Sequence, residues 1–239
     1  LVRHVYPHVG DVPIATFTLD DAERVMESLP AKSGSGGRGL ESNSRRQVAQ
    51  LLGRVMALSV YPLRLREATP IPRGWLPKKG DEKALVWLFP DEDAQLLCCT
   101  SIPLGYRVLY GFLAREGPRV GEALALTKAD VDLQRGVLTL DENKTNDPRM
   151  WALGQEVIKG LARWGERWRA PQLFDVGVEL ADDHLADKLR DHLRLAGVDR
   201  PALFERSKAR RPLRVHDLRA TFVTLALAHG RTEMWVSDR

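Results

Sequence analysis

Cysteine is scarce in this sequence: the 239 residues include two, and these are the neighbours Cys98 and Cys99. A disulfide framework needs cysteines at separate positions, and a metal site needs more ligands than one adjacent pair supplies. Because the pair lies in an apolar stretch, we predict two reduced residues of the core. Reduced cysteines are typical of the cytosol, so the sequence is unlike that of a small secreted domain held by disulfides.

Long hydrophobic runs are also missing. A helix that crosses a membrane takes about 20 apolar residues, and no stretch reaches that length. The chain opens without a secretory signal, and its first residue is Leu1 rather than Met, so we expect a processed or trimmed product or part of a longer chain. Hydrophobic residues make up 44% of the sequence, which is enough for a core in one large or two modest domains.

The excess of positive charge is small overall, at +4, but it is unevenly distributed. Residues 1–86 contain 13 Lys and Arg against 9 Asp and Glu, which accounts for the whole excess, because residues 87–239 contain 23 of each. Within residues 200–219, however, seven basic side chains stand against two acidic ones. A net charge of this size is weak evidence for a nucleic-acid partner, and the local concentrations are better evidence.

The N-terminal part of the chain is predicted to be helical. Thr18 is a good N-cap for a helix over residues 19–29, with acidic residues in its first turn. A glycine-rich loop follows, and then an amphipathic helix over about residues 44–59. Residues 69–86 contain three prolines, and proline discourages helix, so this stretch is predicted to be a linker. The sequence thus divides into residues 1–68, a linker over 69–86, and residues 87–239.

The C-terminal part has mostly helical periodicity, with a short stretch of strand periodicity. The sequence shows no internal repeat. We predict strands over residues 137–140 and 150–153, joined by a polar turn that contains Lys144. Further helices are predicted over residues 90–99, 104–115, a short run after Arg119, 156–167, 179–196, and a last run from His216. The predicted fold class is mainly α with a small antiparallel β-sheet (α+β).

Four residues in this C-terminal part suit one chemistry: Arg119, Lys144, His216 and Arg219. Arginine binds phosphate through a planar fork that keeps its charge, whereas lysine and histidine can transfer protons. His216 and Arg219, three apart, would share one face of a helix. A phosphodiester could be held and cleaved by such a set without a metal. The alternative for each arginine is a surface ion pair, for Arg119 with Glu122 at i+3.

The order of the motifs resembles the catalytic domain of the tyrosine recombinases, the phage integrase family. Residues 117–123 read Gly-Pro-Arg-Val-Gly-Glu-Ala, close to the family's Gly-x-Arg-x-x-Glu-Leu, and residues 126–132 read Leu-Thr-Lys-Ala-Asp-Val-Asp. A hairpin with a Lys-Thr turn follows at residues 144–145. Residues 216–222 then read His-Asp-Leu-Arg-Ala-Thr-Phe, similar to His-x-Leu-Arg-x-Thr-Phe. Pro118 and Ala123 depart mildly from the family pattern.

The resemblance implies a site-specific recombinase or integrase that cleaves and rejoins duplex DNA through a 3′-phosphotyrosyl link. Arg119 and Arg219 would bind the scissile phosphate, Lys144 would protonate the leaving 5′-oxygen, and His216 would contact the phosphate or act as a base. Glu122 would support Arg119. No metal and no other cofactor is implied. Residues 1–68 would be the helical core-binding domain that clamps DNA.

The same resemblance implies duplex DNA as the partner and a homo-oligomer, a dimer on one site and a tetramer in synapsis, in the bacterial or phage-infected cytoplasm at the nucleoid. Basic side chains outside the catalytic set would meet the DNA backbone, which makes affinity fall with salt. These predicted contacts are Arg45, Arg46, Lys78, Lys79, Arg206, Lys208, Arg210, Arg211 and Arg214. A solvated surface remains the alternative for them.

The attacking tyrosine of the family has no counterpart here. It follows a Gly-His or Gly-Trp after the His-x-x-Arg motif, and residues 235–239 resemble the approach to that pair. All four tyrosines, at positions 6, 61, 106 and 110, precede Arg119. We therefore expect either a tail beyond Arg239 or a DNA-binding protein that does not cleave. A type IB topoisomerase-like enzyme shares the expected pocket, and a generic helical scaffold would show no salt-dependent DNA binding.

Overall fold

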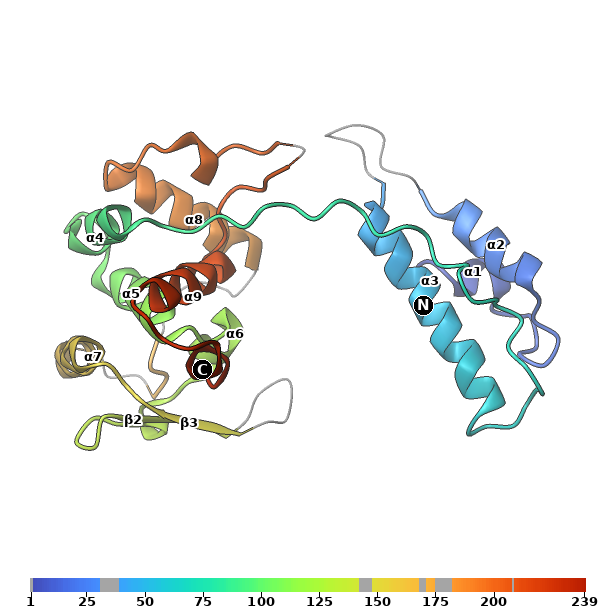
Figure 1. Cartoon of the computed structure of the whole chain (residues 1–239), viewed down its shortest axis with the longest axis horizontal. Helices are drawn as coiled ribbons and strands as arrows, with labels where there is room; N and C mark the ends of the chain where they lie inside the picture. The colour runs from blue at the N-terminus through green and yellow to red at the C-terminus, as the bar shows by residue number, and fades with distance from the viewer. Residues whose placement is uncertain (1, 31–38, 142–147, 168–170, 175–181, 208) are drawn as a thin grey trace. The chain divides into compact units, whose positions relative to one another are not determined.

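The computed structural model describes residues 2–30, 39–141, 148–167, 171–174, 182–207 and 209–239 (Figure 1). The chain forms two compact units, Leu1–Glu82 and Lys83–Arg239. Helices predominate in both, and the described residues contain one three-stranded antiparallel sheet. The predicted fold class, mainly α with a small antiparallel sheet, is confirmed.

The described residues of the first unit form three helices, α1 (Tyr6–Val9), α2 (Leu19–Ser28) and α3 (Ser42–Val60). Thr18 caps α2 as predicted: its Oγ1 accepts a hydrogen bond from the amide of Asp21 at 3.3 Å, and its own amide donates to Asp21 Oδ2 at 2.9 Å. This reciprocal pair satisfies two amides that have no partner within the helix. α2 and α3 then pack together through their apolar faces.

Part of the proline-containing stretch packs onto the first unit. Ile71 and Trp75 lie against the core that Val25, Leu52 and Met56 form between α2 and α3. Further along, Val86 and Leu88 are buried in the core of the second unit. The stretch predicted as a linker therefore contacts the first core near its beginning and the second core at its end.

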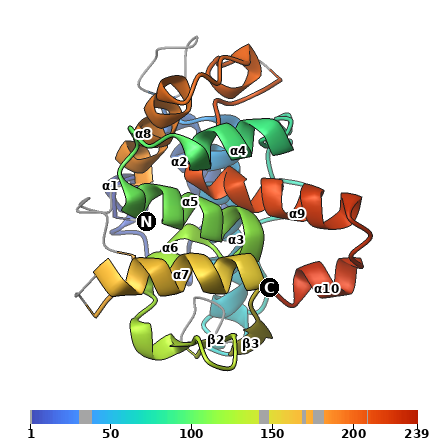
Figure 2. The ribbon, with the colours of Figure 1, turned by 90° about the vertical axis from the view of Figure 1, so that its left-hand side faces the viewer.

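The second unit is built around α5 (Leu104–Glu116). Figure 2 shows α5 in the middle of this unit, and it packs against α4 (Pro90–Cys98), α7 (Gln155–Arg167) and α9 (Leu218–Ala228). Apolar residues on α5, such as Leu109 and Leu113, are almost completely buried. The other helical elements are α6 (Val120–Ala125), η1 (Lys128–Asp130), α8 (Asp182–Leu195), η2 (Pro201–Leu203), η3 (Val215–Asp217) and α10 (Glu233–Ser237).

The sheet has the order β1-β2-β3, with strands β1 (Val131–Asp132), β2 (Val137–Leu140) and β3 (Arg149–Ala152). The predicted hairpin is confirmed, with Val137 opposite Ala152 and Leu140 opposite Arg149. β1 was not predicted, because two residues are too few to show an alternating pattern. The hairpin places Arg149 at the end of β3 that follows the turn, and Lys144 in that turn lies outside the described residues.

Two sequence expectations need correction. Cys98 is exposed at the end of α4 and Cys99 is only partly buried, so the prediction that both are core residues was wrong. The last long helix begins at Leu218, and His216 lies in the preceding 3₁₀ turn, where Asp217 accepts hydrogen bonds from the amide and guanidinium of Arg214.

In the described part of the chain, no helix is both long and apolar enough to cross a membrane.

Candidate functional site

The close approach of α5 and α9 at Gly117 positions the candidate site. Gly117 ends α5 in the left-handed conformation, with φ of +72°, and a side-chain carbon there would overlap the ring of Phe222 in α9. Glycine alone takes this conformation without strain. The carbonyl of Gly117 accepts a hydrogen bond from Arg219, one turn earlier in α9. The glycine of the sequence motif thus brings Arg219 next to the segment that carries Arg119.

Arg119 stands at the start of α6 and is held by Glu122. The amide of Arg119 donates to Glu122 Oε2 at 2.8 Å, and its Nη1 donates to Oε1 at 2.6 Å. The Glu122 side chain is 6% exposed, whereas that of Arg119 is 42% exposed. The ion pair considered from the sequence is therefore present. It uses one edge of the guanidinium, so other donors remain accessible to solvent.

A third guanidinium, which the sequence analysis did not identify, belongs to Arg149 on β3. Its Nη2 lies 3.1 Å from Glu122 Oε2, and its Nη1 donates to the carbonyl oxygen of Arg239 at 2.5 Å. The side chain is 13% exposed. No motif marks Arg149, and the available signal was its place between the Lys144 turn and the strand predicted over residues 150–153.

Arg219 completes a group of three arginines around one carboxylate. It donates to the carbonyl of Arg239 at 3.4 Å, the same oxygen that Arg149 contacts. Burial lowers the pKa of Arg219, the positive charges of Arg119 and Arg149 lower it further, and Glu122 opposes the change. Three guanidinium groups against one carboxylate leave an excess of positive charge, which favours an anion. We call Arg119, Arg149, Arg219 and Glu122 the arginine cluster.

Glu122 stays ionised although it is buried. Burial works to raise its pKa, but the hydrogen bonds from the amide and guanidinium of Arg119 and the charge of Arg149 outweigh burial, so the pKa lies below its usual value. An ionised Glu122 keeps Arg119 fixed at the start of α6. A fixed guanidinium loses little conformational freedom when it binds an anion.

The segment that ends at Arg239 is anchored beside the cluster. The Arg239 guanidinium donates to the carbonyl of Ala152 at 2.8 Å, stacks over Trp235 at 3.8 Å, and lies 3.6 Å from Glu116 Oε2. Glu116 is buried and accepts hydrogen bonds from Trp151 Nε1 and a backbone amide on β3's C-terminal side. Burial raises the pKa of Glu116. These contacts tie α5, β3 and the end of the described chain together.

His216 is exposed and lines a separate hollow of about 340 Å³. This hollow is rich in arginine, and no hydrogen bond joins His216 to the arginine cluster among the residues described. Arg214 pairs with Asp217 at 2.8 Å, and Arg190 of α8 donates to the carbonyl of Leu213 at 2.7 Å. The lining residues are Ala186, Asp187, Arg190, Arg206, Arg211, Pro212, Arg214 and His216. We call this the basic hollow.

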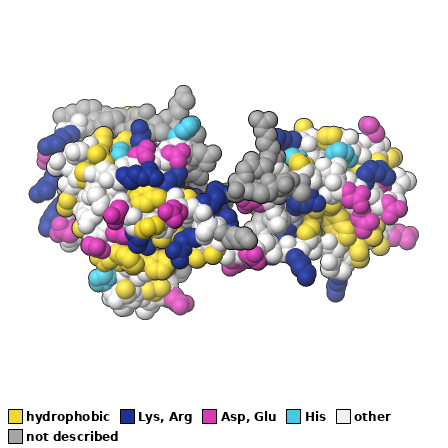
Figure 3. All heavy atoms as spheres, turned by 90° about the horizontal axis from the view of Figure 1, so that it is seen from above, with side chains coloured by type: hydrophobic (Ala, Val, Ile, Leu, Met, Phe, Trp, Pro, Cys, Tyr) yellow, Lys and Arg dark blue, Asp and Glu magenta, His cyan; other side chains and the backbone are white. Residues whose placement is uncertain are grey.

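The other predicted DNA contacts differ in exposure. Arg45 and Arg46 are half-buried and donate to backbone carbonyls, Arg45 to those of Leu29 at 2.6 Å and Met26 at 2.9 Å. The exposed ones are Lys78, Lys79, Arg206, Arg210 and Arg211. Lys208 lies outside the described residues, as Lys144 does. On the face in Figure 3, Lys and Arg side chains are interspersed with hydrophobic and acidic ones.

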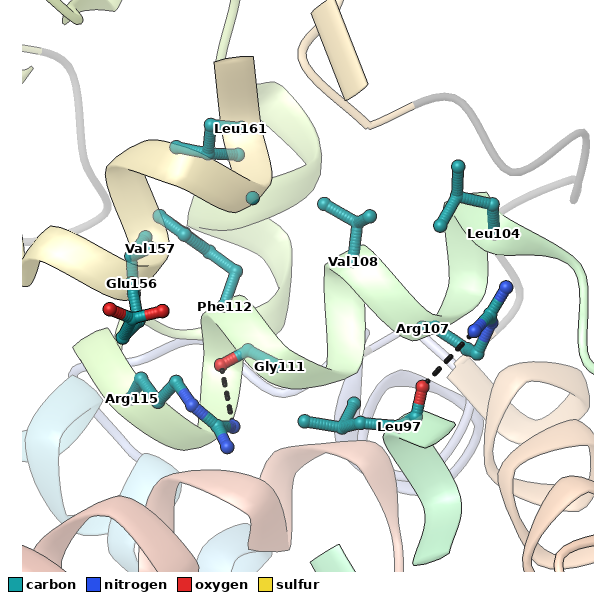
Figure 4. A pocket seen from close by; sticks show the side chains of 11 residues that line it. Leu97, Leu104, Arg107, Val108, Gly111, Phe112, Arg115, Glu156, Val157 and Leu161 are labelled. Carbon is teal, nitrogen blue, oxygen red and sulfur yellow. Dashed lines mark hydrogen bonds between the residues drawn. The ribbon is translucent and has the colours of Figure 1, made fainter. Parts of the chain in front are cut away.

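An apolar groove of about 230 Å³ lies along α5 and α7 (Figure 4). Val108 and Phe112 of α5 and Val157 and Leu161 of α7 line it, with Arg107 at one end. None of the predicted site residues lines this groove.

Among the described residues, no group of three or more His, Cys, Asp or Glu side chains could hold a metal ion.

No protein-family model matches the sequence. A curated Sinorhizobium fredii protein, y4rB, whose name gives it as a predicted integrase/recombinase, is 32% identical over 114 residues. The match covers 43% of this chain and 36% of that relative, so the matched part of the chain spans about a third of the relative's length.

Solved structures match almost the whole chain. XerA recombinase matches with a TM-score of 0.53 and 22% identity, over 99% of this chain and 78% of that chain. A lambda integrase dimer bound to a COC′ core site matches with a TM-score of 0.69 and 13% identity, over 98% and 82%. The Tn1549 transposon integrase in complex with a circular intermediate DNA matches with a TM-score of 0.64 and 15% identity, over 94% and 77%. At these identities the likeness shows a shared fold.

Proposed function

We propose that this chain, which has the fold of the tyrosine recombinases, binds duplex DNA and activates a phosphodiester for site-specific recombination or integration. The observation that carries the proposal is the arginine cluster, where Arg119 and Arg219 from segments 100 positions apart in the sequence meet beside one buried carboxylate. Structural relatives that were solved in complex with DNA support it. The proposed partner is duplex DNA, bound by a homo-oligomer.

In the proposed reaction, the oxygen of a tyrosine attacks the scissile phosphorus and the bond to the 5′-oxygen breaks. The products are a 3′-phosphotyrosyl link and a free 5′-hydroxyl, and a 5′-hydroxyl of another strand reverses the step. Arg119 and Arg219 would bind the non-bridging oxygens, where charge grows in the transition state. Glu122 would orient Arg119 without touching the phosphate.

Two proton transfers remain to be assigned. Lys144 would donate a proton to the leaving 5′-oxygen, and the hairpin β2–β3 that carries it adjoins the cluster through Arg149. His216 would hydrogen-bond the phosphate or receive the tyrosine proton. Because His216 faces the basic hollow, we propose that DNA spans from this hollow to the arginine cluster, with Arg206, Arg211 and Arg214 along the backbone.

None of the four tyrosines suits the role of nucleophile. Tyr106 and Tyr110 are buried in α5, where Tyr110 bonds His192 at 3.0 Å and burial raises the pKa of Tyr110. Tyr6 and Tyr61 belong to the first unit. We therefore propose that the attacking tyrosine is encoded beyond Arg239. A reading frame without it would make the protein a DNA-binding relative that does not cleave.

The first unit would be the DNA-clamping core-binding domain, within residues 1–68, joined by residues 69–86 to the catalytic domain over 87–239. The exposed Lys78 and Lys79 lie in the joining stretch, where they would contact the phosphate backbone of DNA. Arg45 and Arg46 serve internal hydrogen bonds as well, so their contribution to DNA binding should be smaller than that of the exposed lysines.

The proposal is tested with the protein expressed from its complete reading frame. Binding sites are selected from random duplexes and then nicked, so that the short 5′-hydroxyl fragment diffuses away and the covalent intermediate accumulates. We expect an adduct that survives denaturing electrophoresis and is lost in Arg219→Ala and Arg119→Ala. The matched control is Arg135→Ala, an exposed arginine of the same unit.

This experiment and a plasmid-relaxation assay together decide between the candidate functions. Binding that falls with salt but gives no adduct would make the protein a non-cleaving DNA-binding protein. Relaxation of supercoiled plasmid without strand exchange would favour a topoisomerase-like enzyme. An adduct that persists in Arg219→Ala would show that the arginine cluster is not the reaction site.

A further inference from the structure

The side chain of Arg149 is largely enclosed by the candidate site. The residue lies on β3 and faces Leu140 across the hairpin, yet its side chain is 13% exposed rather than extended into solvent. Its two terminal nitrogens go to Glu122 and to the Arg239 carbonyl, while its Nε is buried without a hydrogen-bond partner among the described residues. Enclosing a guanidinium with one donor unused costs free energy. A functional role for its charge would explain why the residue is kept.

The first consequence concerns the charge of Arg119. Glu122 divides its two oxygens between the guanidiniums: Oε1 accepts from Arg119 Nη1 and Oε2 from Arg149 Nη2. Without Arg149, Arg119 and Glu122 would form a neutral pair with little attraction for phosphate. With Arg149 the trio carries a net charge of +1, because two guanidiniums share one carboxylate, and Arg119 remains attractive to an anion.

The second consequence concerns the orientation of Arg219. Arg149 Nη1 and Arg219 Nη1 donate to the same oxygen, the Arg239 carbonyl, at 2.5 and 3.4 Å. That carbonyl belongs to the segment anchored through Glu116 and Ala152. Arg149 therefore fixes the acceptor that helps to orient Arg219, and it adds positive charge next to it.

We propose that Arg149 is a positioning residue of the anion site. It holds Glu122 between two guanidiniums and the Arg239 carbonyl beside Arg219, so that both phosphate-binding arginines stay oriented and net positive. It also ties the start of β3 to α6, through Glu122, and to the segment anchored at Arg239. This inference rests on the proposed function, because it assigns a role in binding the same phosphate.

The test measures inorganic phosphate binding by the protein expressed from its complete reading frame, through the Nε–Hε NMR signals of Arg119 and Arg219. This readout needs neither the DNA site nor the attacking tyrosine. Arg149→Ala should weaken phosphate binding by about tenfold or more, as removal of supporting partners does in metal sites. Arg149→Lys should restore part of the loss, since it keeps the charge but not the two-sided fork. Arg135→Ala, an exposed arginine paired with Asp132, should bind as wild type.

A merely structural role is separated by a double-mutant cycle with Glu122→Gln. If Arg149 acts through Glu122, Arg149→Ala should weaken binding less in the Glu122→Gln background than in the wild type. Equal losses in both backgrounds would overturn the positioning role. Should Arg149→Ala fail to fold, Arg149→Met, which keeps the aliphatic stem in the partly buried site, takes its place in the cycle.

The failure of this inference and the failure of the proposed function give different results. If Arg119→Ala and Arg219→Ala weaken phosphate binding while Arg149→Ala and Arg149→Met do not, the inference is wrong and the phosphate site stands. If phosphate shifts neither arginine signal in the wild-type chain, the phosphate site itself is wrong.

Discussion

At the scale of single residues, Glu122 joins two arginines of the candidate site, one at the start of its own helix and one on β3. Its Oε1 accepts a hydrogen bond from the guanidinium of Arg119, and its Oε2 accepts from the amide of Arg119 and from Arg149. The residue is 7% exposed, so its charge is stabilised mainly by these groups rather than by water. Stability should therefore depend on whether Glu122 is ionised.

We predict that part of the stability of the protein depends on pH through Glu122. Its pKa in the folded chain lies below the ordinary 4.5, so its contribution is present above that value and is lost as the pH falls through the lowered pKa. Glu122→Gln should cost about 2 kcal/mol of unfolding free energy at neutral pH, because charged hydrogen bonds are lost. The difference from wild type should shrink below pH 4.5.

Urea unfolding from neutral to acid pH measures this difference. Glu205→Gln, at an exposed position of the same unit, is the matched control and should unfold as the wild type does. A difference between Glu122→Gln and wild type that stays constant down to pH 3, about one unit or more below the ordinary pKa of a glutamate, would show that the charge of Glu122 is not what stabilises the fold.

Sequence reasoning reached some of these residues and not others for a physical reason. Arg119 and Glu122 are three apart, so their pairing follows from local geometry. Arg149 meets Glu122 across 27 positions, and no periodic pattern encodes such a contact. Arg200 was counted in the basic concentration before His216. In the folded chain it pairs with Glu92 at 2.6 Å, 108 positions away, and stacks on Phe89.

At the scale of elements, helix length decided what the sequence could reveal. α2, α3, α5 and α7 are ten residues or longer, and their apolar periodicity placed them within a few residues of their observed bounds. The two-residue strand β1 and the five-residue helix α10 are too short to show a period. The exposure of Cys98 was missed because an apolar stretch does not reveal which side of a helix end faces solvent.

The junction of α5 and α9 is predicted to tolerate no side chain at Gly117. Alanine there would adopt a positive φ, which costs about 1 kcal/mol, and would press on Phe222, which costs about 1–3 kcal/mol more. Gly117→Ala should therefore lower the unfolding free energy by about 3 kcal/mol. It should also weaken phosphate binding, because α9 carries Arg219.

Gly121→Ala is the matched control for this substitution. Gly121 lies in α6, is exposed, and has open space where a side chain would stand, so alanine should stabilise the helix by up to about 1 kcal/mol. Chemical denaturation of the two variants compares them directly. Similar stabilities for both would mean that α5 and α9 can separate at Gly117 without loss.

At the scale of the whole molecule, the charge distribution matters more than the net charge of +4. The basic hollow gathers arginines from α8 and from the segment before His216, although the second unit from residue 87 onward is neutral overall. Local clusters of this kind attract phosphate over about a Debye length, and salt screens them. DNA affinity should therefore fall steeply with salt.

The exposed arginines before His216 are predicted to carry part of this salt dependence. Arg210→Glu with Arg211→Glu should weaken binding to any duplex and flatten the slope of log affinity against log salt by about 1 per lost phosphate contact. Arg163→Glu with Arg167→Glu, exposed on α7, changes the net charge equally and should alter the slope less. Equal slopes in both variants would assign the arginines before His216 to a solvated loop.

The position of Cys98 makes it suitable for attaching a fluorescent label at one site. It is exposed at the end of α4, while Cys99 is partly buried with its Sγ 3.7 Å from the carbonyl of Leu195, and the sequence contains no other cysteine. A maleimide dye should therefore attach first at Cys98. One fluorophore in the second unit, paired with one at a known position on a DNA duplex, would turn docking into a distance that energy transfer can follow in real time.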